Sequence, residues 1–161
     1  MNYSVRPARK CDLDRICRIY AYARAFMANH GNPNQWGKTH PPVEQLEKDI
    51  EAGDLYVITG EEEIHGVFYF FIGPDPTYGR IFEGCWHAHR PYGTIHRIAG
   101  DGSGGILAAA VKFGRQRIDH LRIDTHEDNY VMQRAVEKQG FRRCGIIYIA
   151  DGSPRIAYDL T

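Results

Sequence analysis

A glycine-rich turn between a strand pattern and a helix pattern is the feature that most constrains how this chain can fold. The segment reads His96-Arg-Ile-Ala-Gly-Asp-Gly-Ser-Gly-Gly-Ile-Leu107. A helix that begins here presents unpaired backbone N–H groups and the positive end of its dipole, and glycines let a ligand approach the backbone closely. The segment therefore predicts a strand–turn–helix unit that binds a phosphate or pyrophosphate. A tight turn without a ligand is the alternative.

The same turn also matches the spacing of a dinucleotide-binding loop. Gly100, Gly102 and Gly105 spell G-x-G-x-x-G, and Asp124 ends the next predicted strand at about the distance that such sites require. Too few residues follow the turn to complete a doubly wound sheet, and the residues before it do not alternate strand and helix. A dinucleotide-dependent oxidoreductase stays as an alternative function.

Hydrophobic periodicity predicts one mixed α/β domain over residues 1–161. The segment 81–86 is left open as a strand or a packed loop, and Asp12 is the expected N-cap of the first helix. The continuous apolar run at 67–72 favours a central strand. Helices are expected at 13–28, 43–52, 106–117 and 129–139, and strands at 2–6, 55–59, 64–72, 94–99, 121–124, 141–149 and 155–160.

Charge and hydropathy exclude several classes of protein. Lys plus Arg and Asp plus Glu both total 20, and this balance argues against a dedicated nucleic-acid binder. No apolar run reaches the length of a membrane span, and the first residues lack the apolar core of a signal peptide. We therefore expect a cytoplasmic protein with neither a nucleic-acid nor a membrane partner. The basic residues Arg115, Arg117, Arg122, Arg142 and Arg143 are expected on a solvated face.

The four cysteines do not predict a metal site. They lie far apart without a C-x-x-C pair, which indicates reduced structural thiols. Cys85, His87 and His89 would share one face of a strand, but no fourth ligand lies nearby in the sequence. We expect no metal.

The order of elements and two motifs resemble the GCN5-related N-acetyltransferase (GNAT) superfamily over nearly the full length. Gly105-Ile106 resembles the centre of that family's Q/R-x-x-G-x-G/A signature. Asn129-Tyr-Val-Met-Gln-Arg-Ala-Val-Glu-Lys-Gln-Gly-Phe141 resembles its N-x-x-A-x-x-L-Y-E-K-x-G-F stretch. The resemblance implies a mixed, mostly antiparallel central sheet flanked by helices. It also implies a splayed central strand that forms the cleft for acetyl-coenzyme A.

The sequence departs from the family pattern at three positions. Gly102 stands where the signature has Gln or Arg, and Leu107 stands where it has a second small residue. The turn is also about three residues shorter than usual. Val136 occupies the position of the tyrosine that often protonates the leaving thiolate, and valine has no proton to give. The role of the acid is therefore vacant or has moved.

The resemblance assigns roles to individual residues. The end of the central strand and Asn129 would hold the pantetheine arm, although Asn129 could instead only cap its helix. His96 is the first choice for the general base because imidazole titrates near neutral pH, with Glu83 and His126 behind it. Tyr148 and Cys144 are conceivable acids. The predicted cosubstrate contacts are Ile98, Ala99, Gly100, Gly102, Ser103, Gly104, Gly105, Ile106 and Asn129.

The function that the resemblance implies is transfer of an acetyl group from acetyl-coenzyme A to a primary amine of a small molecule or peptide. A non-catalytic acyl-coenzyme A sensor is a further alternative, because Val136 replaces the usual tyrosine. Trp36 lies where the family has an acceptor-side loop, and it either closes over the acceptor or packs the loop down. The sequence names neither the acceptor nor the acyl chain, and it leaves a homodimer open.

Overall fold

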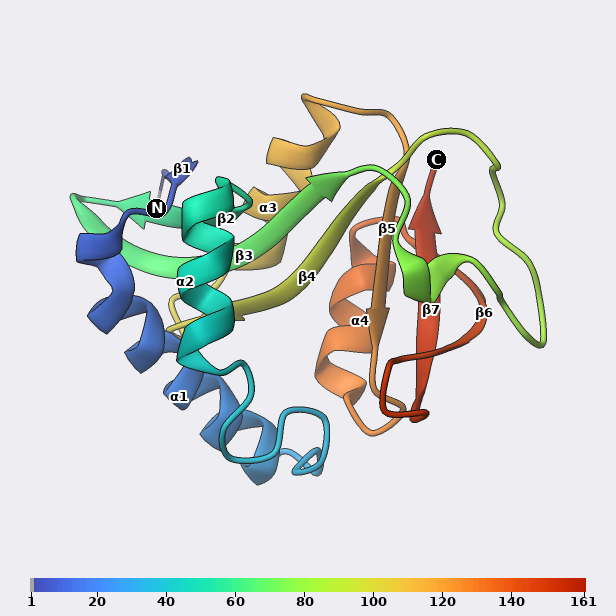
Figure 1. The fold of residues 1–161 in the computed structure, drawn as a ribbon, viewed down its shortest axis with the longest axis horizontal. Helices are drawn as coiled ribbons and strands as arrows, with labels where there is room; N and C mark the ends of the chain where they lie inside the picture. Colours follow the sequence, from blue (N-terminus) through green and yellow to red (C-terminus); the bar gives the residue numbers. More distant parts are fainter. Residues whose placement is uncertain (1) are drawn as a thin grey trace.

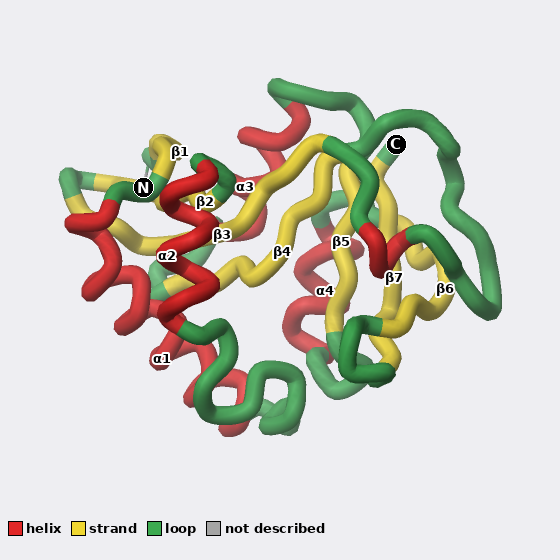
Figure 2. Tube along the Cα trace, viewed as in Figure 1, coloured by secondary structure: helices red, strands yellow, loops and turns green. Residues whose placement is uncertain are grey.

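The computed structural model describes residues 2–161, and it places one seven-stranded sheet between two layers of covering segments (Figures 1 and 2). The helices are α1 (Leu13–Asn29), α2 (Val43–Ala52), α3 (Ile106–Arg115) and α4 (Tyr130–Lys138). Two short 3₁₀ helices are η1 (Lys10–Asp12) and η2 (Pro76–Tyr78). The strands are β1 (Ser4–Pro7), β2 (Leu55–Gly60), β3 (Glu63–Ile72), β4 (Gly93–Gly100), β5 (Leu121–Thr125), β6 (Arg142–Tyr148) and β7 (Pro154–Leu160).

The sheet separates at its centre. Its strand order is β1-β2-β3-β4-β5-β7-β6, and every neighbouring pair is antiparallel except β4 and β5. These two strands pair only at Gly93↔Leu121 and Thr94↔Arg122. Beyond Thr94 they diverge, as Figure 1 shows. The predicted fold class, a mostly antiparallel α/β sheet with a splayed central strand, is confirmed.

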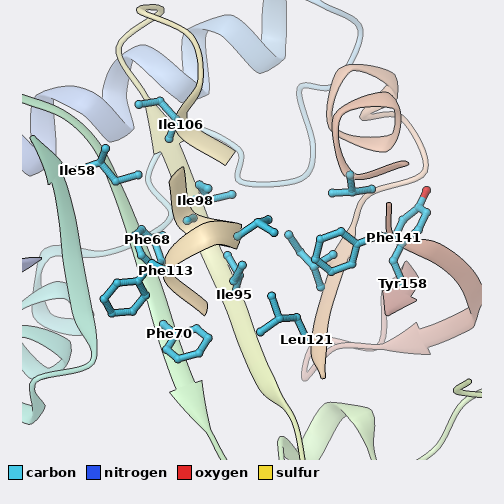
Figure 3. Packing of buried hydrophobic residues seen from close by; sticks show 14 of the residues in the cluster. Ile58, Phe68, Phe70, Ile95, Ile98, Ile106, Phe113, Leu121, Phe141 and Tyr158 are labelled. Atoms are coloured by element: carbon cyan, nitrogen blue, oxygen red, sulfur yellow. The ribbon is translucent and has the colours of Figure 1, made fainter. Parts of the chain in front are cut away.

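Helices α3 and α4 cover one face of the sheet. Their apolar residues join those of the central strands in a single core cluster, of which Figure 3 shows the central part. Phe68, Ile95, Leu121 and Val136 are all almost completely buried there. Burial of such side chains is worth about 1.5–3 kcal/mol each.

The opposite face is divided between two covers. Helices α1 and α2 pack on β2, β3 and β4 around Ile16, Tyr20 and Leu46. The segment between β3 and β4 instead covers β5, β7 and β6, with Tyr78 and Trp86 buried against Ala157 and Ile147. The gap between β4 and β5 lies between these two covers.

The structure decides one open alternative and corrects two sequence expectations. Residues 81–86, left open as a strand or a packed loop, form a loop in which Phe82 pairs with Ile146 at the edge strand β6. Arg122 is buried and not solvated, because its guanidinium lies 3.9 Å from the ring centres of both Trp86 and Tyr92. Asp12 does precede α1, but its carboxylate accepts the Arg9 N–H and pairs with Arg6 rather than capping the helix.

Candidate active site

A cavity of about 650 Å³ lies where β4 and β5 separate. Its walls come from residues 95–98 of β4, residues 123–125 of β5 and the start of α4. Two loops close it from the other side, one at 34–37 between α1 and α2 and one around Asp75. Trp36 both lines this cavity and packs its ring against Tyr20 of α1. The cavity therefore lies between the two covers described above.

A β-bulge in β4 orients the residues that face this cavity. The pairing with β3 shifts between Val67↔Ala99 and Tyr69↔His96, so Arg97 and Ile98 together oppose one residue, and Arg97 takes a left-handed φ of 49°. The Arg97 carbonyl, released from the regular ladder, accepts a 2.7 Å hydrogen bond from the buried Tyr20 hydroxyl. The bulge thus fixes the part of the strand that carries His96.

His96 stands between two carboxylates. Its Nε2 lies 2.7 Å from Asp75 Oδ2, and its Nδ1 lies 3.7 Å from Asp124 Oδ2. Asp124 also accepts a 2.6 Å hydrogen bond from the buried Tyr78 hydroxyl. An Nε2–H donated to Asp75 leaves Nδ1 free to accept a proton. The distance from Nδ1 to Asp124 is too long for a direct hydrogen bond, which suits a donor lying between them.

Asp75 is ionised by its surroundings. It precedes η2 and accepts hydrogen bonds from the Thr77 N–H at 2.8 Å and the Thr77 hydroxyl at 2.6 Å. Burial alone would raise the pKa of Asp75, but the hydrogen bonds from His96 and Thr77 outweigh it and set the pKa at about 2. The result is a fixed negative charge behind His96.

The depressed pKa of Asp75 predicts a change in acid stability. Because the folded pKa lies below the ordinary value of 3.8, the ionised group stabilises the fold above about pH 4, and this contribution disappears as the pH falls toward 2. Asp75→Asn is expected to lower the free energy of unfolding by about 2 kcal/mol at pH 7. Its stability should also depend less on pH between 4 and 2. Urea titrations across this range measure both effects.

Asp119→Asn is the matched control, since that carboxyl side chain is 79% exposed. It should leave both the stability at pH 7 and its acid dependence near wild type. If Asp75→Asn matched this control, the carboxylate would not be stabilised in the folded state.

The glycine-rich turn has the geometry that an anion needs. Gly102, Gly104 and Gly105 all take left-handed φ values, and α3 starts directly after Gly105. No side chain among residues 2–161 caps this helix, so its first N–H groups have no side-chain partner. A Cβ on Gly104 would meet nothing within 4 Å. These features fit the pyrophosphate of coenzyme A, with the backbone N–H groups as the donors.

Asp101 holds this turn in place through hydrogen bonds and ion pairs. Its carboxylate accepts the Ser103 N–H at 3.0 Å and the Ser103 hydroxyl at 2.6 Å, and it pairs with Arg15 and His65. The Ser103 amide is therefore already bonded within the turn. Ile98 lines the cavity, while Ala99 and Gly100 continue the strand to the turn.

Asn129 has two structural contacts at the cavity. Its Oδ1 accepts the Met132 N–H at 3.0 Å and so caps α4, and its Nδ2 donates to Gln35 Oε1 at 2.9 Å. The second bond ties the start of α4 to the loop between α1 and α2. Both Asn129 and Gln35 line the cavity. Capping and a contact with the pantetheine arm are therefore compatible at this residue.

The other candidate acids and bases lie away from the cavity wall. Glu83 is exposed in the loop before β4 with a φ of 57°, and His126 Nδ1 accepts the N–H of Asp128. Tyr148 is 45% exposed at the end of β6, where its ring packs edge-on against Phe82. Cys144 is buried on β6, and burial raises the pKa of its thiol to about 12.

Sequence reasoning missed the partners of His96. Asp75 sits between two prolines and before Thr77, a pattern that marks a capping aspartate, but no local signal directs it toward a histidine on another strand. The sequence shows a spacing of Asp124 from the glycines but no signal that it lies beside a histidine. Tyr78, which orients Asp124, gave no signal at all.

His87, Cys144 and Asp159 form a cluster whose side-chain atoms are close enough to hold a metal ion. Hydrogen bonding accounts for it, because the backbone N–H and Nδ1 of His87 both contact Asp159, at 2.8 and 2.6 Å. Cys85 and His89, which the sequence grouped with His87, lie on an irregular loop rather than a strand. The cluster fastens the segment before β4 to β7.

Val136 contacts the core and not solvent. Val136 lies on the inner side of α4, and its side chain is completely buried in the cluster that α4 shares with α3 and the sheet. We therefore expect Val136→Tyr to overpack this core and to destabilise the protein by about 1–3 kcal/mol. Val131→Tyr, on the same helix but at a side chain that is 46% exposed, should cost little. Chemical denaturation compares the two, and faster turnover by an equally stable Val136→Tyr variant would contradict this expectation.

Comparison with known proteins agrees with this geometry. No family model matches the chain, and no curated protein matches it either. Among solved structures, a GNAT-family acetyltransferase from Streptococcus agalactiae 2603 has a TM-score of 0.87 at 30% identity, over 98% of this chain and 94% of that one. A GNAT-family acetyltransferase from Listeria monocytogenes 4b F2365 has a TM-score of 0.70 at 20% identity, over 98% and 93%. A ribosomal-protein-alanine N-acetyltransferase from Brucella melitensis has a TM-score of 0.61 at 20% identity, over 97% and 98%.

The sheet of this chain separates at its central parallel pair beside a glycine-rich turn and helix, and the whole fold matches that of a solved acetyltransferase. The streptococcal structure is 30% identical to this chain and is matched over 94% of its length, which is enough to assign the family. The chain belongs to the GNAT family of acetyltransferases. None of the helices within residues 2–161 combines the length and apolarity that a membrane crossing needs.

Proposed function

We propose that this acetyltransferase transfers the acetyl group of acetyl-coenzyme A to a primary amine of a small molecule or peptide, with His96 as the general base. The observation that carries the proposal is the position of His96, between Asp75 and Asp124 on the wall of the cavity. Acetyl-coenzyme A supplies an activated thioester. The glycine-rich turn, the start of α3 and Asn129 are the residues that would hold it.

The amine reaches the site as an ammonium ion and must lose a proton before it can attack. Nδ1 of His96 accepts that proton, while Asp75 holds the ring and stabilises its protonated form through Nε2. Asp124, fixed by Tyr78, attracts the ammonium ion toward Nδ1. Holding both groups in place lowers the entropic part of the barrier.

Because Val136 stands where the family often has a tyrosine, the departing thiolate lacks the usual proton donor. An alkyl thiol has a pKa of about 8.5, so its thiolate is a tolerable leaving group near neutral pH. We therefore expect modest turnover. The rate should rise with pH through a single ionisation, with no alkaline fall below about pH 9, and a bell-shaped profile would show that another residue acts as the acid.

Calorimetry with acetyl-coenzyme A, coenzyme A and NADH, followed by thiol release on a panel of amines, tests the proposal. We expect both coenzyme A species to bind and at least one amine to be acetylated. Binding of NADH in their place would favour the oxidoreductase, and binding without turnover would favour the sensor. The family assignment favours neither. We propose the cytoplasm as its location, because Cys11, Cys17, Cys85 and Cys144 are all free thiols.

A further inference from the structure

A buried arginine lines the acceptor side of the cavity without an acidic partner. Arg155, at the start of β7, is 6% exposed and forms part of the cavity wall. Its guanidinium donates only to uncharged oxygens: the Pro154 carbonyl at 2.8 Å, the Ser153 hydroxyl at 3.2 Å and the Gln35 carbonyl at 3.5 Å. No carboxylate among residues 2–161 forms an ion pair with it within 4.0 Å. Asp124 and Asp151 act on it only at longer range.

Arg97, which is half-buried, and Arg122, which is buried, have partners on this face. Arg97, which also lines the cavity, pairs with Asp49 of α2 and lies over the ring of Tyr69. Arg122 is enclosed by two aromatic rings, as described above. Taking a guanidinium out of water is costly unless an anion or several hydrogen bonds compensate it. Arg155 is thus a buried cation that faces a cavity and lacks a close counter-ion.

Sheet register places Arg155 on the same face as the proposed base. Asp124 of β5 pairs with Ala157 of β7, and Arg155 is two residues from Ala157, so both point to one side of the sheet. Ala157 packs with Tyr78, whose hydroxyl bonds Asp124 and whose ring lies 5.8 Å from that of His96. Residues two apart on a strand are separated by about 7 Å. The cavity wall therefore has the carboxylate of Asp124 on β5 and, two residues along the neighbouring strand β7 from its pairing partner Ala157, an arginine without a close carboxylate.

Several arginines lie near His40 at this end of the cavity, and Asp124 and Asp151 act on Arg155 from a longer distance. His40, on the loop that closes the cavity, has a lowered pKa because burial disfavours its charged form and because Arg97, Arg155 and Arg24 repel it. An acceptor that carried only an amine would gain nothing from these charges. An acceptor with an anionic group could place its ammonium ion at Asp124 and its anion at Arg155.

We propose that Arg155 binds a carboxylate of the acceptor, so that the substrate is a small amine that also carries a carboxylate, as an amino acid does. The inference rests on the proposed N-acetyltransferase function and adds the substrate class. A guanidinium matches a carboxylate with two parallel N–H···O bonds, whereas an uncharged amine offers it no partner.

Matched pairs of acceptors that differ only in the carboxylate test this proposal. Suitable pairs are L-alanine with ethylamine, 4-aminobutanoate with propylamine, and 6-aminohexanoate with pentylamine. For at least one pair, the wild-type protein should acetylate the carboxylate-bearing member with a kcat/KM about 10- to 100-fold higher. Arg155→Met should abolish this preference, because it should lower kcat/KM far more for the carboxylate-bearing member than for the plain amine. Arg155→Lys should retain part of the preference, because it keeps the charge without the fork.

Arg143→Met is the control for net charge, because Arg143 is an exposed arginine on the neighbouring strand β6. It should leave the preference at its wild-type value. Equal rates for both members of every pair, or an equal loss on both in Arg155→Met, would overturn the proposal while the acetyltransferase function still stood.

If no acceptor is acetylated, a second measurement tests the carboxylate site at Arg155 separately from the proposed function. In that case the proposed function fails for these amines, and calorimetry of the N-acetylated amino acids with the coenzyme A-loaded protein still tests Arg155. Binding that is about 10-fold or more weaker in Arg155→Met than in wild type would support the carboxylate site. Equal binding would refute it.

Discussion

His96→Gln is expected to lower kcat by about 10²- to 10⁴-fold, while the affinity for coenzyme A stays within about threefold of wild type. Glutamine can still donate a hydrogen bond to Asp75, but it has no nitrogen that accepts a proton near neutral pH. The ionisation that raises the wild-type rate with pH should move or disappear in this variant. Thiol release at saturating acetyl-coenzyme A, measured from pH 6 to 10, gives both results.

The matched control is His126→Gln. His126 is the other histidine among the candidate bases, and its Nδ1 accepts the Asp128 N–H after β5 without lining the cavity. It should keep kcat within a few-fold of wild type. A large loss in His126→Gln with little change in His96→Gln would transfer the base to the other histidine.

Gly105→Glu is expected to weaken coenzyme A binding about 100-fold. Gly105 has a φ of 73° directly before α3, and a carboxylate there would meet the phosphates that the helix start attracts. Like charges placed together in a binding site cost several kcal/mol. Calorimetry with coenzyme A measures the loss.

Part of this effect would come from strain, since any side chain at this φ is disfavoured and its Cβ would lie 3.2 Å from the Tyr3 ring. Gly105→Gln carries the same strain and nearly the same bulk without the charge. The difference in affinity between the Glu and Gln variants isolates the electrostatic part, and it should shrink as salt is added. If the two variants bound coenzyme A equally, the turn would not hold its phosphates.

The sequence predicted the helices and strands around this site better than the partners of its polar side chains. The start of α3 after Gly105 and the cap of α4 at Asn129 are local features, written in neighbouring residues, and both lie where they were expected. The mixed α/β class followed from the order of such local features, whereas the splayed, mostly antiparallel sheet was implied by the resemblance to the GNAT superfamily. The pattern of β4 placed His96 on a strand, and the resemblance implied that this strand lies beside the gap.

The partners of these residues depend on long-range packing that no local pattern encodes. Asp75 reaches His96 only because the segment between β3 and β4 folds back over the sheet, and Asp124 reaches it only because β5 runs beside β4. Arg122 shows the same dependence on long-range packing, because it is buried where an exposed residue was expected. Its charge predicted an exposed position, but Trp86 and Tyr92 from a distant loop enclose it.

The alternation of side chains along β5 has a consequence for how such a site tolerates insertions and deletions. Ile123 belongs to the core beneath α3 and α4, whereas the next residue, Asp124, faces the acceptor side. A deletion of one residue within this strand would exchange the two and bury the carboxylate in the apolar core. Length changes in the loops at 30–42 and 79–92 would leave that alternation intact. Insertions and deletions can therefore change acceptor recognition when they fall in these loops, but not when they fall in β5.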